Sequence, residues 1–289
     1  MTPRLLYWSV RRELWENRSI YIAPLAAAGV VLLGFAIGAL HLSDARRAVL
    51  LLDPTRQHAV VSMPYQLAAA ALILTGVIVA MFYCLGALHN ERRDRSILFW
   101  KSLPVSDLTT VLSKAAIPLA VMPAVVFVVA VATQLVMLVL TTVVLLANGV
   151  SITTPATQAP LLEMTLTMLY GLVTLTLWYA PVWGWLLLVS GWAKRAPFLW
   201  AVLPPLAVCL VEKIAFDSTN FASMLANRLG GGFSAAFSEA TPDAHRQGFD
   251  LQDLDPIKFL STPGLWVGLA LAIAFLATAV WLRRRREPI

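Results

Sequence analysis

The chain has 289 residues, of which 59% are hydrophobic and only 13% are charged, with a net charge of +6. Soluble domains carry about a quarter charged residues, and a soluble fold would need a far larger core than this length provides. The composition therefore excludes an ordinary soluble protein and predicts an all-α integral membrane protein.

The first predicted element is an amphipathic helix over residues 1–19. Leu5, Trp8, Arg12 and Trp15 share one side of it. An Arg- and Trp-rich amphipathic helix before a membrane span is typical of a segment that lies in the bilayer interface. The alternative interpretation is a flexible, positively charged flank to the first span.

Six segments then have the roughly 20 mostly apolar residues that a spanning helix needs. They are residues 20–42, 65–88, 115–147, 161–193, 197–215 and 263–282. The third and fourth are longer than a bilayer requires, so they must tilt, kink or protrude. Pro118, Pro123 and Pro181 offer points for a kink in these two segments. The adjacent Pro204 and Pro205 remove two backbone donors from the fifth segment, which predicts a bend or break there.

The orientation follows from the distribution of Lys and Arg. With six spans both termini lie on one side, which then carries 15 basic residues, against 7 on the other side. Because basic residues are enriched in cytoplasmic segments, we expect both termini in the cytoplasm. Arg283 to Arg286 would then anchor the last span, and no nucleic-acid partner is expected. The whole of 1–289 is predicted to be a single transmembrane domain.

The cytoplasmic connection over residues 91–106 reads ERRDRSILFWKSLPVS. Its first part predicts a short helix with arginines and an apolar patch. Pro104 then ends that helix, because the residue before a proline avoids the α region. Ser106 is a good N-cap for the helix that leads into the third span. On periodicity alone, an interfacial helix that only eases the turn explains the segment equally well.

The order of residues in this connection is more specific. It contains Glu91-Arg92, Ser96-Ile97-Leu98, Ser102 to Ser106, and then Val111 and Lys114. This order resembles the cytoplasmic loop of type-2 ABC transporter permeases, the membrane subunits of exporters. Six spans, cytoplasmic termini and an amphipathic N-terminal helix also agree with that family. Arg95 and Ser113 depart from it, since glycine is usual at both places.

The resemblance implies that 91–106 is a coupling helix and elbow that docks on an ATP-binding cassette ATPase. Such a docked helix needs apolar anchors and charges that fix its register. The docking residues carried over are Glu91, Arg92, Arg95, Leu98, Phe99, Trp100 and Pro104. The chain itself lacks the G-x-x-x-x-G-K-[ST] phosphate loop, so ATP and magnesium are expected on the partner ATPase, with no cofactor on this chain.

The family further implies a second permease copy, as a homodimer or pseudo-dimer, in the inner (cytoplasmic) membrane of a bacterium. The predicted function is a permease subunit that moves a substrate outward and performs no covalent chemistry, so the chain is not expected to be an enzyme. Two alternatives remain open. One is a secondary transporter or channel, which the lack of buried charges in the spans disfavours. The other is a membrane-embedded enzyme, which the lack of clustered catalytic residues disfavours.

Few polar residues fall at membrane depth, and such residues tend to face a cavity or a partner. The candidates for a pathway or gate are Gln134, Glu163, Pro204, Pro205 and Glu212. Because Glu212 and Lys213 are adjacent and do not share a helix face, each is expected to have another partner. The four histidines and two cysteines show no metal-ligand spacing, and no metal site is predicted.

Two G-x-x-x-G pairs, Gly34 with Gly38 and Gly264 with Gly268, predict close helix packing. Packing within the chain is the first interpretation, and contact with a second copy is the alternative. The outer segment, 216–262, is predicted to contain a short helix over Phe221–Leu229, ended by glycines. The rest of that segment is interpreted either as further short helices or as a flexible loop.

Overall fold

The computed structural model describes residues 3–39, 54–94, 106–147, 161–232 and 254–285. Within these residues, six helices are long and apolar enough to cross a membrane. Each of the six overlaps one predicted span. The prediction of a helical, multi-pass membrane protein is therefore confirmed at this level. The interfacial and coupling roles of the N-terminal helix and of 91–106 stay predictions.

The described helices follow one another along the chain without an intervening sheet. Their bounds are α1 Pro3–Glu16, α2 Ser19–Ala39, α4 Pro54–Ala87, α5 His89–Arg93, α7 Asp107–Ala116, the π-helix η1 Ile117–Val121, α8 Met122–Ala147, α9 Leu161–Trp192, α10 Pro197–Phe216, α11 Asn220–Gly230, α13 Pro256–Ser261 and α14 Pro263–Arg285.

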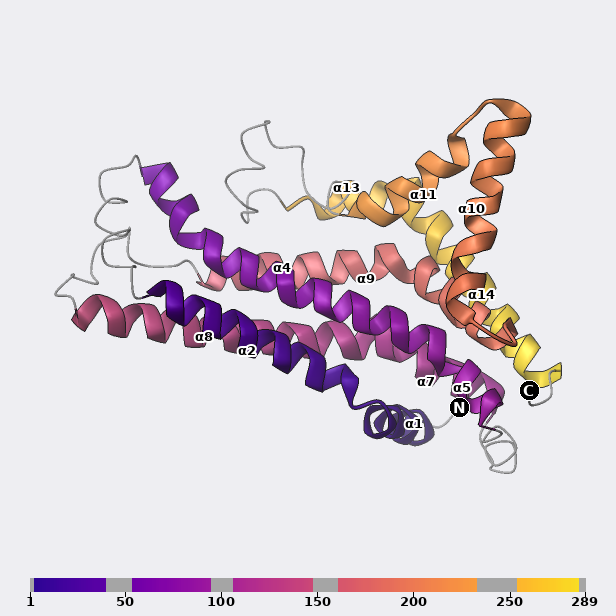
Figure 1. The fold of residues 1–289 in the computed structure, drawn as a ribbon, viewed down its shortest axis with the longest axis horizontal. Coiled ribbons are helices and arrows are strands. Elements are labelled where there is room, and N and C mark those ends of the chain that lie inside the picture. The colour runs from indigo at the N-terminus through magenta and orange to yellow at the C-terminus, as the bar shows by residue number, and fades with distance from the viewer. Residues whose placement is uncertain (1–2, 40–53, 95–105, 148–160, 233–253, 286–289) are drawn as a thin grey trace.

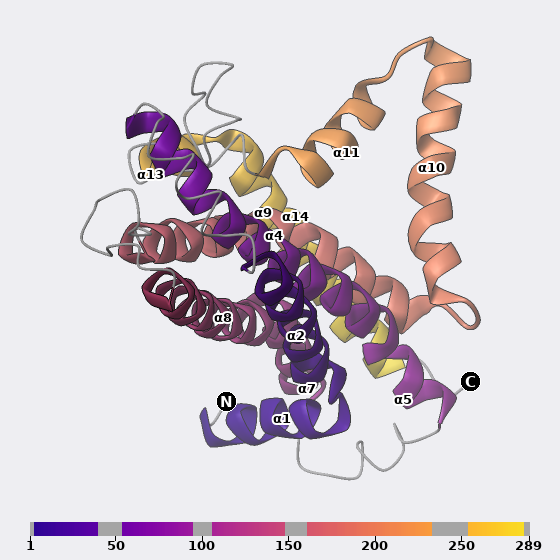
Figure 2. The ribbon, with the colours of Figure 1, turned by 60° about the vertical axis from the view of Figure 1, so that its left-hand side comes forward.

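Helices α2, α4, α8 and α9 form the body of a bundle, and α14 packs along α9 (Figure 1). Helix α1 lies across one end of the bundle, where it packs against α7 (Figure 2). Helix α10 stands apart from the bundle in both views and is joined to α11. Only 6% of the apolar stretch of α10 is buried, against 61% for α9, so α10 contributes little to the core.

The core lies between α2, α4, η1, α8 and α9. Ile20, Leu72, Ile117 and Leu187 are fully buried in it. Helices α4 and α8 approach each other closely at Gly76. A Cβ atom there would lie 2.5 Å from the side chain of Val126, so a larger residue would require Val126 or the helices to shift.

The third span is continuous from Asp107 but changes its hydrogen-bonding pattern at one predicted kink point. Pro118 lies in η1, a single π-type stretch between two α-helices. Such stretches arise where the regular ladder is interrupted, as it is by a residue without an N–H. Helix α9, by contrast, continues as an α-helix through Pro181.

The predicted break at Pro204 and Pro205 is wrong, because α10 is one uninterrupted helix. In a regular helix the N–H of residue 205 would donate to the carbonyl of Ala201, and proline leaves that carbonyl without its donor. Here the indole N–H of Trp185 donates to the Ala201 carbonyl at 3.0 Å. A side chain from α9 thus supplies the hydrogen bond that the proline removes.

The short helix predicted over Phe221–Leu229 is confirmed as α11, which spans Asn220–Gly230. Most of the segment that followed it in the prediction lies outside the described residues. The part that is described, just before the last span, forms α13, whose first turn is capped by the side chain of Asp255.

Candidate functional site

A set of buried charged side chains lies at the end of the bundle where α1, α5, α7 and the last turns of α14 meet (Figure 1). We call it the charged cluster. Its members are Arg12, Glu13, Glu91, Asp107, Lys114 and Arg283. These six residues are three acids and three bases, so their formal charges balance, and the partly exposed Glu16 lies 3.5 Å from Arg12 at the edge of the cluster. Balance matters because a buried charge without a partner is strongly destabilising.

Glu13 of α1 lies at the centre of this cluster and is fully buried, with 0% exposure. Its carboxylate accepts hydrogen bonds from Lys114 Nζ at 3.0 Å and from Arg12 Nη2 at 2.9 Å. The hydroxyl of Tyr83 donates to its other oxygen at 2.9 Å. Burial alone raises the pKa of Glu13, but the Lys114 ammonium and these hydrogen bonds outweigh it and hold the pKa below its ordinary value. Glu13 is therefore ionised at neutral pH.

Besides Arg12, which lies 2.9 Å from Glu13 and 3.8 Å from Glu91, two further basic side chains are each shared between two acids from different helices. Lys114 Nζ lies 3.0 Å from Glu91 as well as 3.0 Å from Glu13. Arg283, near the end of α14, donates to Glu91 and, at 3.1 Å, to Asp107. Through these two shared residues, α1, α5, α7 and α14 are joined in one continuous network.

The start of α5 is fastened to the end of α9. The backbone N–H groups of Leu88 and His89 both donate to the hydroxyl of Ser190, at 3.0 and 2.9 Å. Ser190 thereby acts as an N-cap supplied by another helix, since the residue before α5 caps it with no side chain of its own. Arg92 adds a hydrogen bond to the carbonyl of Gly191 at 2.7 Å. The end of α4 and the start of α5 are thus joined to the end of α9.

Most of the predicted docking residues fall outside the described part of the chain. These are Arg95, Leu98, Phe99, Trp100 and Pro104. Glu91 and Arg92 are described, and they are only 8% and 5% exposed. Both side chains contact the chain's own helices, as set out above. Their docking role stays a prediction, and what the geometry adds is an internal role for both.

Both ends of the connection over 95–105 are fixed to the same buried structure. Before it, Glu91 belongs to the charged cluster. After it, the predicted N-cap is confirmed, because Ser106 Oγ accepts the backbone N–H of Thr109 at 3.1 Å. Lys114, two turns further along α7, then pairs with Glu91. The described residues before and after 95–105 are therefore joined to each other by a buried ion pair between Glu91 and Lys114.

The site residues predicted from sequence do not include Glu13, Tyr83 or Asp107, and Arg283 was predicted only as part of the basic anchor of the last span, whereas it pairs with Glu91 and Asp107. One signal for Glu13 does exist, because it is an acid between Val10 and Leu14, on the face of the helix opposite Trp8. A charge in such a position is normally paired. The partner, 101 positions further along the chain, is not visible from spacing.

The five residues predicted to line a pathway or gate are not brought together. Gln134 is buried in α8, where its amide nitrogen lies 3.4 Å from the carbonyl of Tyr65. Glu163 is exposed in the first turn of α9. Pro204, Pro205 and Glu212 all lie on α10. They occupy three separate places in the structure, so they do not define one site.

Glu212 and Lys213 have the separate partners that were predicted. The carboxylate of Glu212 accepts the backbone N–H groups of Asn220 and Phe221, at 2.9 and 2.8 Å, and so caps α11. Lys213 pairs with Asp217 one turn later, at 2.6 Å. Glu212 thus shapes the turn between α10 and α11.

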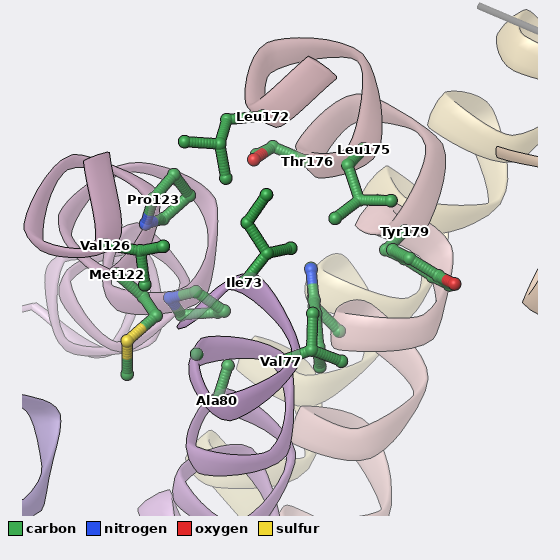
Figure 3. Close-up of a pocket in the computed structure, with 13 residues that line it drawn as sticks. Ile73, Val77, Ala80, Met122, Pro123, Val126, Leu172, Leu175, Thr176 and Tyr179 are labelled. Carbon is green, nitrogen blue, oxygen red and sulfur yellow. The ribbon is translucent and has the colours of Figure 1, made fainter. Parts of the chain in front are cut away.

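One apolar hollow lies among α4, η1, α8 and α9 (Figure 3). Ile73, Val126 and Leu175 are typical of its walls, while Thr176 and Tyr179 bring polar atoms to its rim. None of the predicted pathway residues lines it. It is framed by the π-helix η1, which is the one described place where the third span departs from α geometry.

Helix α10 is held to α9 by tryptophans seven residues apart. We call Trp178, Trp185 and Trp192 the tryptophan row. Trp185 donates to the carbonyl of Ala201, and the ring of Trp192 meets that of Trp200 edge to face at 4.7 Å. A seven-residue spacing keeps the three indoles on one face of α9. The face of α9 that carries the tryptophan row is therefore where the α10–α11 pair attaches to the bundle.

The third member of the row holds α11. The indole N–H of Trp178 donates to the carbonyl of Arg228 at 3.0 Å, and the guanidinium of Arg228 lies 4.5 Å from the centre of the same ring. Arg228 also donates to the carbonyl of Gly264 on α14 at 3.2 Å. A Cβ atom at Gly268 would lie 1.2 Å from this guanidinium, so the glycine makes room for it. Burial lowers the pKa of Arg228.

The two G-x-x-x-G pairs have different surroundings. Gly264 and Gly268 serve contacts within the chain, but the partner at Gly268 is an arginine side chain. Around Gly34 and Gly38 no atom of the described chain lies within 4 Å of an added Cβ. The expected packing within the chain is therefore wrong for the first pair, because this face of α2 points away from α4 and α8. Contact with a second copy stays a prediction for it.

Among the described residues, no group of three or more His, Cys, Asp or Glu side chains is placed to hold a metal ion. A scan against protein-family models and searches of curated proteins and of solved structures found no match.

Proposed function

We propose that this chain is the transmembrane permease subunit of an ATP-binding cassette exporter. In this proposal it moves a substrate outward, using ATP hydrolysed with magnesium by a separate partner ATPase, and carries out no covalent chemistry. The order of residues over 91–114 suggests the class. The observation that carries the proposal is the buried ion pair between Glu91 and Lys114, which joins the two ends of the connection at 3.0 Å.

The charged cluster is suited to transmit a force from a docked ATPase into the helix bundle. A force on 95–105 enters the bundle through α5 and α7 together, because Glu91 and Lys114 join them. It then passes to α14 through Arg283, to α1 through Glu13, and to α9 through the Ser190 cap. A loop that only turned the chain around would need no such connections to three other helices.

The proposal also includes a second copy of the permease. Helix α10 supports this, because it is apolar and almost wholly exposed within one chain. In a bilayer such a helix is covered either by lipid or by another protein. The exposed glycine face of α2 offers a second place where another backbone can approach closely.

The proposal is tested by purifying the chain, in mild detergent, from cells that express it with its chromosomal neighbours. We expect an ATPase that has a Gly-rich phosphate loop to co-purify with the chain. The purified complex should hydrolyse ATP. In the double variant Trp100→Ala with Phe99→Ala, the ATPase should be lost while the permease elutes unchanged. Truncating buried aromatic anchors typically costs about 2 kcal/mol or more, roughly a thirtyfold loss in affinity.

A matched control is the double variant Trp266→Ala with Phe216→Ala. It removes the same two side-chain types from positions that are 59% and 78% exposed and distant in the chain from 91–106. It should keep the full amount of ATPase. If the Trp100 and Phe99 variant also keeps it, the docking assignment is wrong. Substrate transport by the chain without any ATPase would support the secondary-transporter alternative.

A further inference from the structure

Helix α1 has two faces with different roles. The inner face carries Val10 and Leu14, which pack on the core, together with the fully buried Glu13. The ion pair between Glu13 and Lys114 fixes this face against α7. The rotation of α1 about its own axis is therefore set, and the opposite face points away from the rest of the described chain.

That opposite face carries one row of alternating arginines and tryptophans. We call it the Arg–Trp row, and its members are Arg4, Trp8, Arg11, Trp15 and Arg18. Steps of four and three residues keep the first four on a single stripe of α1, and Arg18 lies in the turn that directly follows the helix. The row contains three cations and no acid.

The side chains within the row contact one another. The guanidinium carbon of Arg11 lies 5.1 Å from the ring centre of Trp8 and 4.9 Å from that of Trp15. These two indoles are nevertheless 56% and 66% exposed. A guanidinium stacked between two rings keeps its edge donors, which match the oxygens of a phosphate. The row is thus an ordered, exposed and purely cationic surface.

The position of the row fits a membrane surface. Only Asn17 and Arg18 separate the end of α1 from α2, which is long and apolar enough to cross a bilayer. Helix α1 lies across the end of the bundle where α2 begins (Figure 2). In a bilayer that α2 spans, α1 would therefore lie near the headgroup level. Tryptophan favours the headgroup level of a bilayer, and arginine is attracted to anionic lipids there.

We propose that the Arg–Trp row is a binding surface for anionic phospholipid headgroups and discriminates them from zwitterionic ones. This inference does not depend on the ATPase partner. Each basic residue at such a surface contributes about a fivefold preference, which corresponds to about 1 kcal/mol. The row therefore enriches anionic lipid around α1, on a helix that Glu13 joins directly to the charged cluster.

The test uses the full chain in nanodiscs of phosphatidylcholine that contain a small fraction of brominated lipid, which quenches nearby tryptophans. The signal of Trp8 and Trp15 is obtained as the difference between the wild type and the double variant Trp8→Phe with Trp15→Phe. We expect brominated phosphatidylglycerol to quench this signal at least fivefold more effectively than brominated phosphatidylcholine. Added salt should reduce the difference.

Three variants decide the outcome. R4Q/R11Q/R18Q should bring the ratio of the two quenching efficiencies close to one, and R4K/R11K/R18K should keep most of it. The matched control R93Q/R195Q/R284Q removes three exposed arginines from outside α1 and should leave the ratio unchanged. Equal quenching by both lipids in the wild type would overturn the proposal. So would an R4Q/R11Q/R18Q variant with the wild-type ratio, or a control that loses as much as that variant.

Discussion

Two regions of the molecule are held together by different chemistry. Where α1, α5, α7 and α14 meet, acids and bases form one network of ion pairs, in which Lys114 pairs with both Glu13 and Glu91. Around α10 and α11 the contacts are hydrogen bonds from indoles to backbone carbonyls and one guanidinium over a ring. The first region links five helices, counting α9, while the second links a largely exposed pair of helices to α9 and α14.

This difference between ion pairs and neutral hydrogen bonds predicts which of the two regions can move. A buried ion pair that loses one partner leaves a buried charge, whereas a neutral hydrogen bond contributes only about 1 kcal/mol net. Helix α10 is also bounded by Ala196 and Asp217, two non-glycine residues with φ of 46° and 47°. Residues in that region store backbone strain. We therefore expect the charged cluster to stay intact during function, and α10 with α11 to be the part that shifts.

The largest effect is expected for Lys114→Met. It leaves Glu13 and Glu91 close together with only the partly exposed Arg12 between them, so it should lower the free energy of unfolding by about 3–5 kcal/mol. Lys213→Met is the matched control, since it removes a lysine whose pair with Asp217 is largely exposed. Titration with sodium dodecyl sulfate in mixed micelles measures both. A loss at Lys114 no greater than at Lys213 would mean that the cluster does not hold the helices together.

The same cluster predicts an acid dependence. The folded-state pKa of Glu13 is lowered, so its contribution to stability is complete above the ordinary carboxyl pKa of about 4.3 and is lost as pH falls through the folded value. The difference in melting temperature between the wild type and Glu13→Gln should be constant from pH 7 to about 5 and shrink below about 4.3. A difference that stays constant to pH 3 would contradict the assignment.

Glu16, one turn along α1, should behave in the opposite way. Burial raises its pKa, so its ionised form is disfavoured in the fold and stability gains as pH falls through that raised value. At pH 7, Glu16→Gln should therefore be no less stable than the wild type. Melting temperatures of the two glutamine variants, measured side by side, separate a buried partner in the cluster from a partly exposed neighbour.

The spans were predictable from sequence because hydropathy is a local property. So were the Ser106 cap and α11, because their signals, a serine after a proline and a run of glycines, lie next to the helices they bound. The charged cluster was not, since Glu13 and Lys114 are separated by 101 positions and only the fold brings them together. Helix α10 was misjudged at its prolines for the same reason, because the donor that replaces their N–H comes from another helix.

A smaller effect is expected for Trp185→Phe, which removes the donor to the Ala201 carbonyl. We expect a loss of about 1 kcal/mol in the free energy of unfolding. Pro205→Ala restores the backbone N–H that the helix lacks at this place, so Trp185→Phe should cost much less in that background. The double-mutant cycle measures this coupling directly. Equal costs in both backgrounds would show that Trp185 does not replace the missing donor.

The smallest effect separates the two glycine pairs. Gly34→Ala meets no described atom and should stabilise α2 by about 1 kcal/mol through helix propensity. Gly268→Ala gains the same propensity but displaces the guanidinium of Arg228 from the ring of Trp178, a contact of about 0.5–1 kcal/mol, so its net effect should be near zero. In an Arg228→Gln background Gly268→Ala should become as stabilising as Gly34→Ala. Unfolding titrations of the four variants test this. If Gly34→Ala instead destabilises the chain, and the loss depends on the concentration of protein in the micelle, a second copy lies against that face of α2.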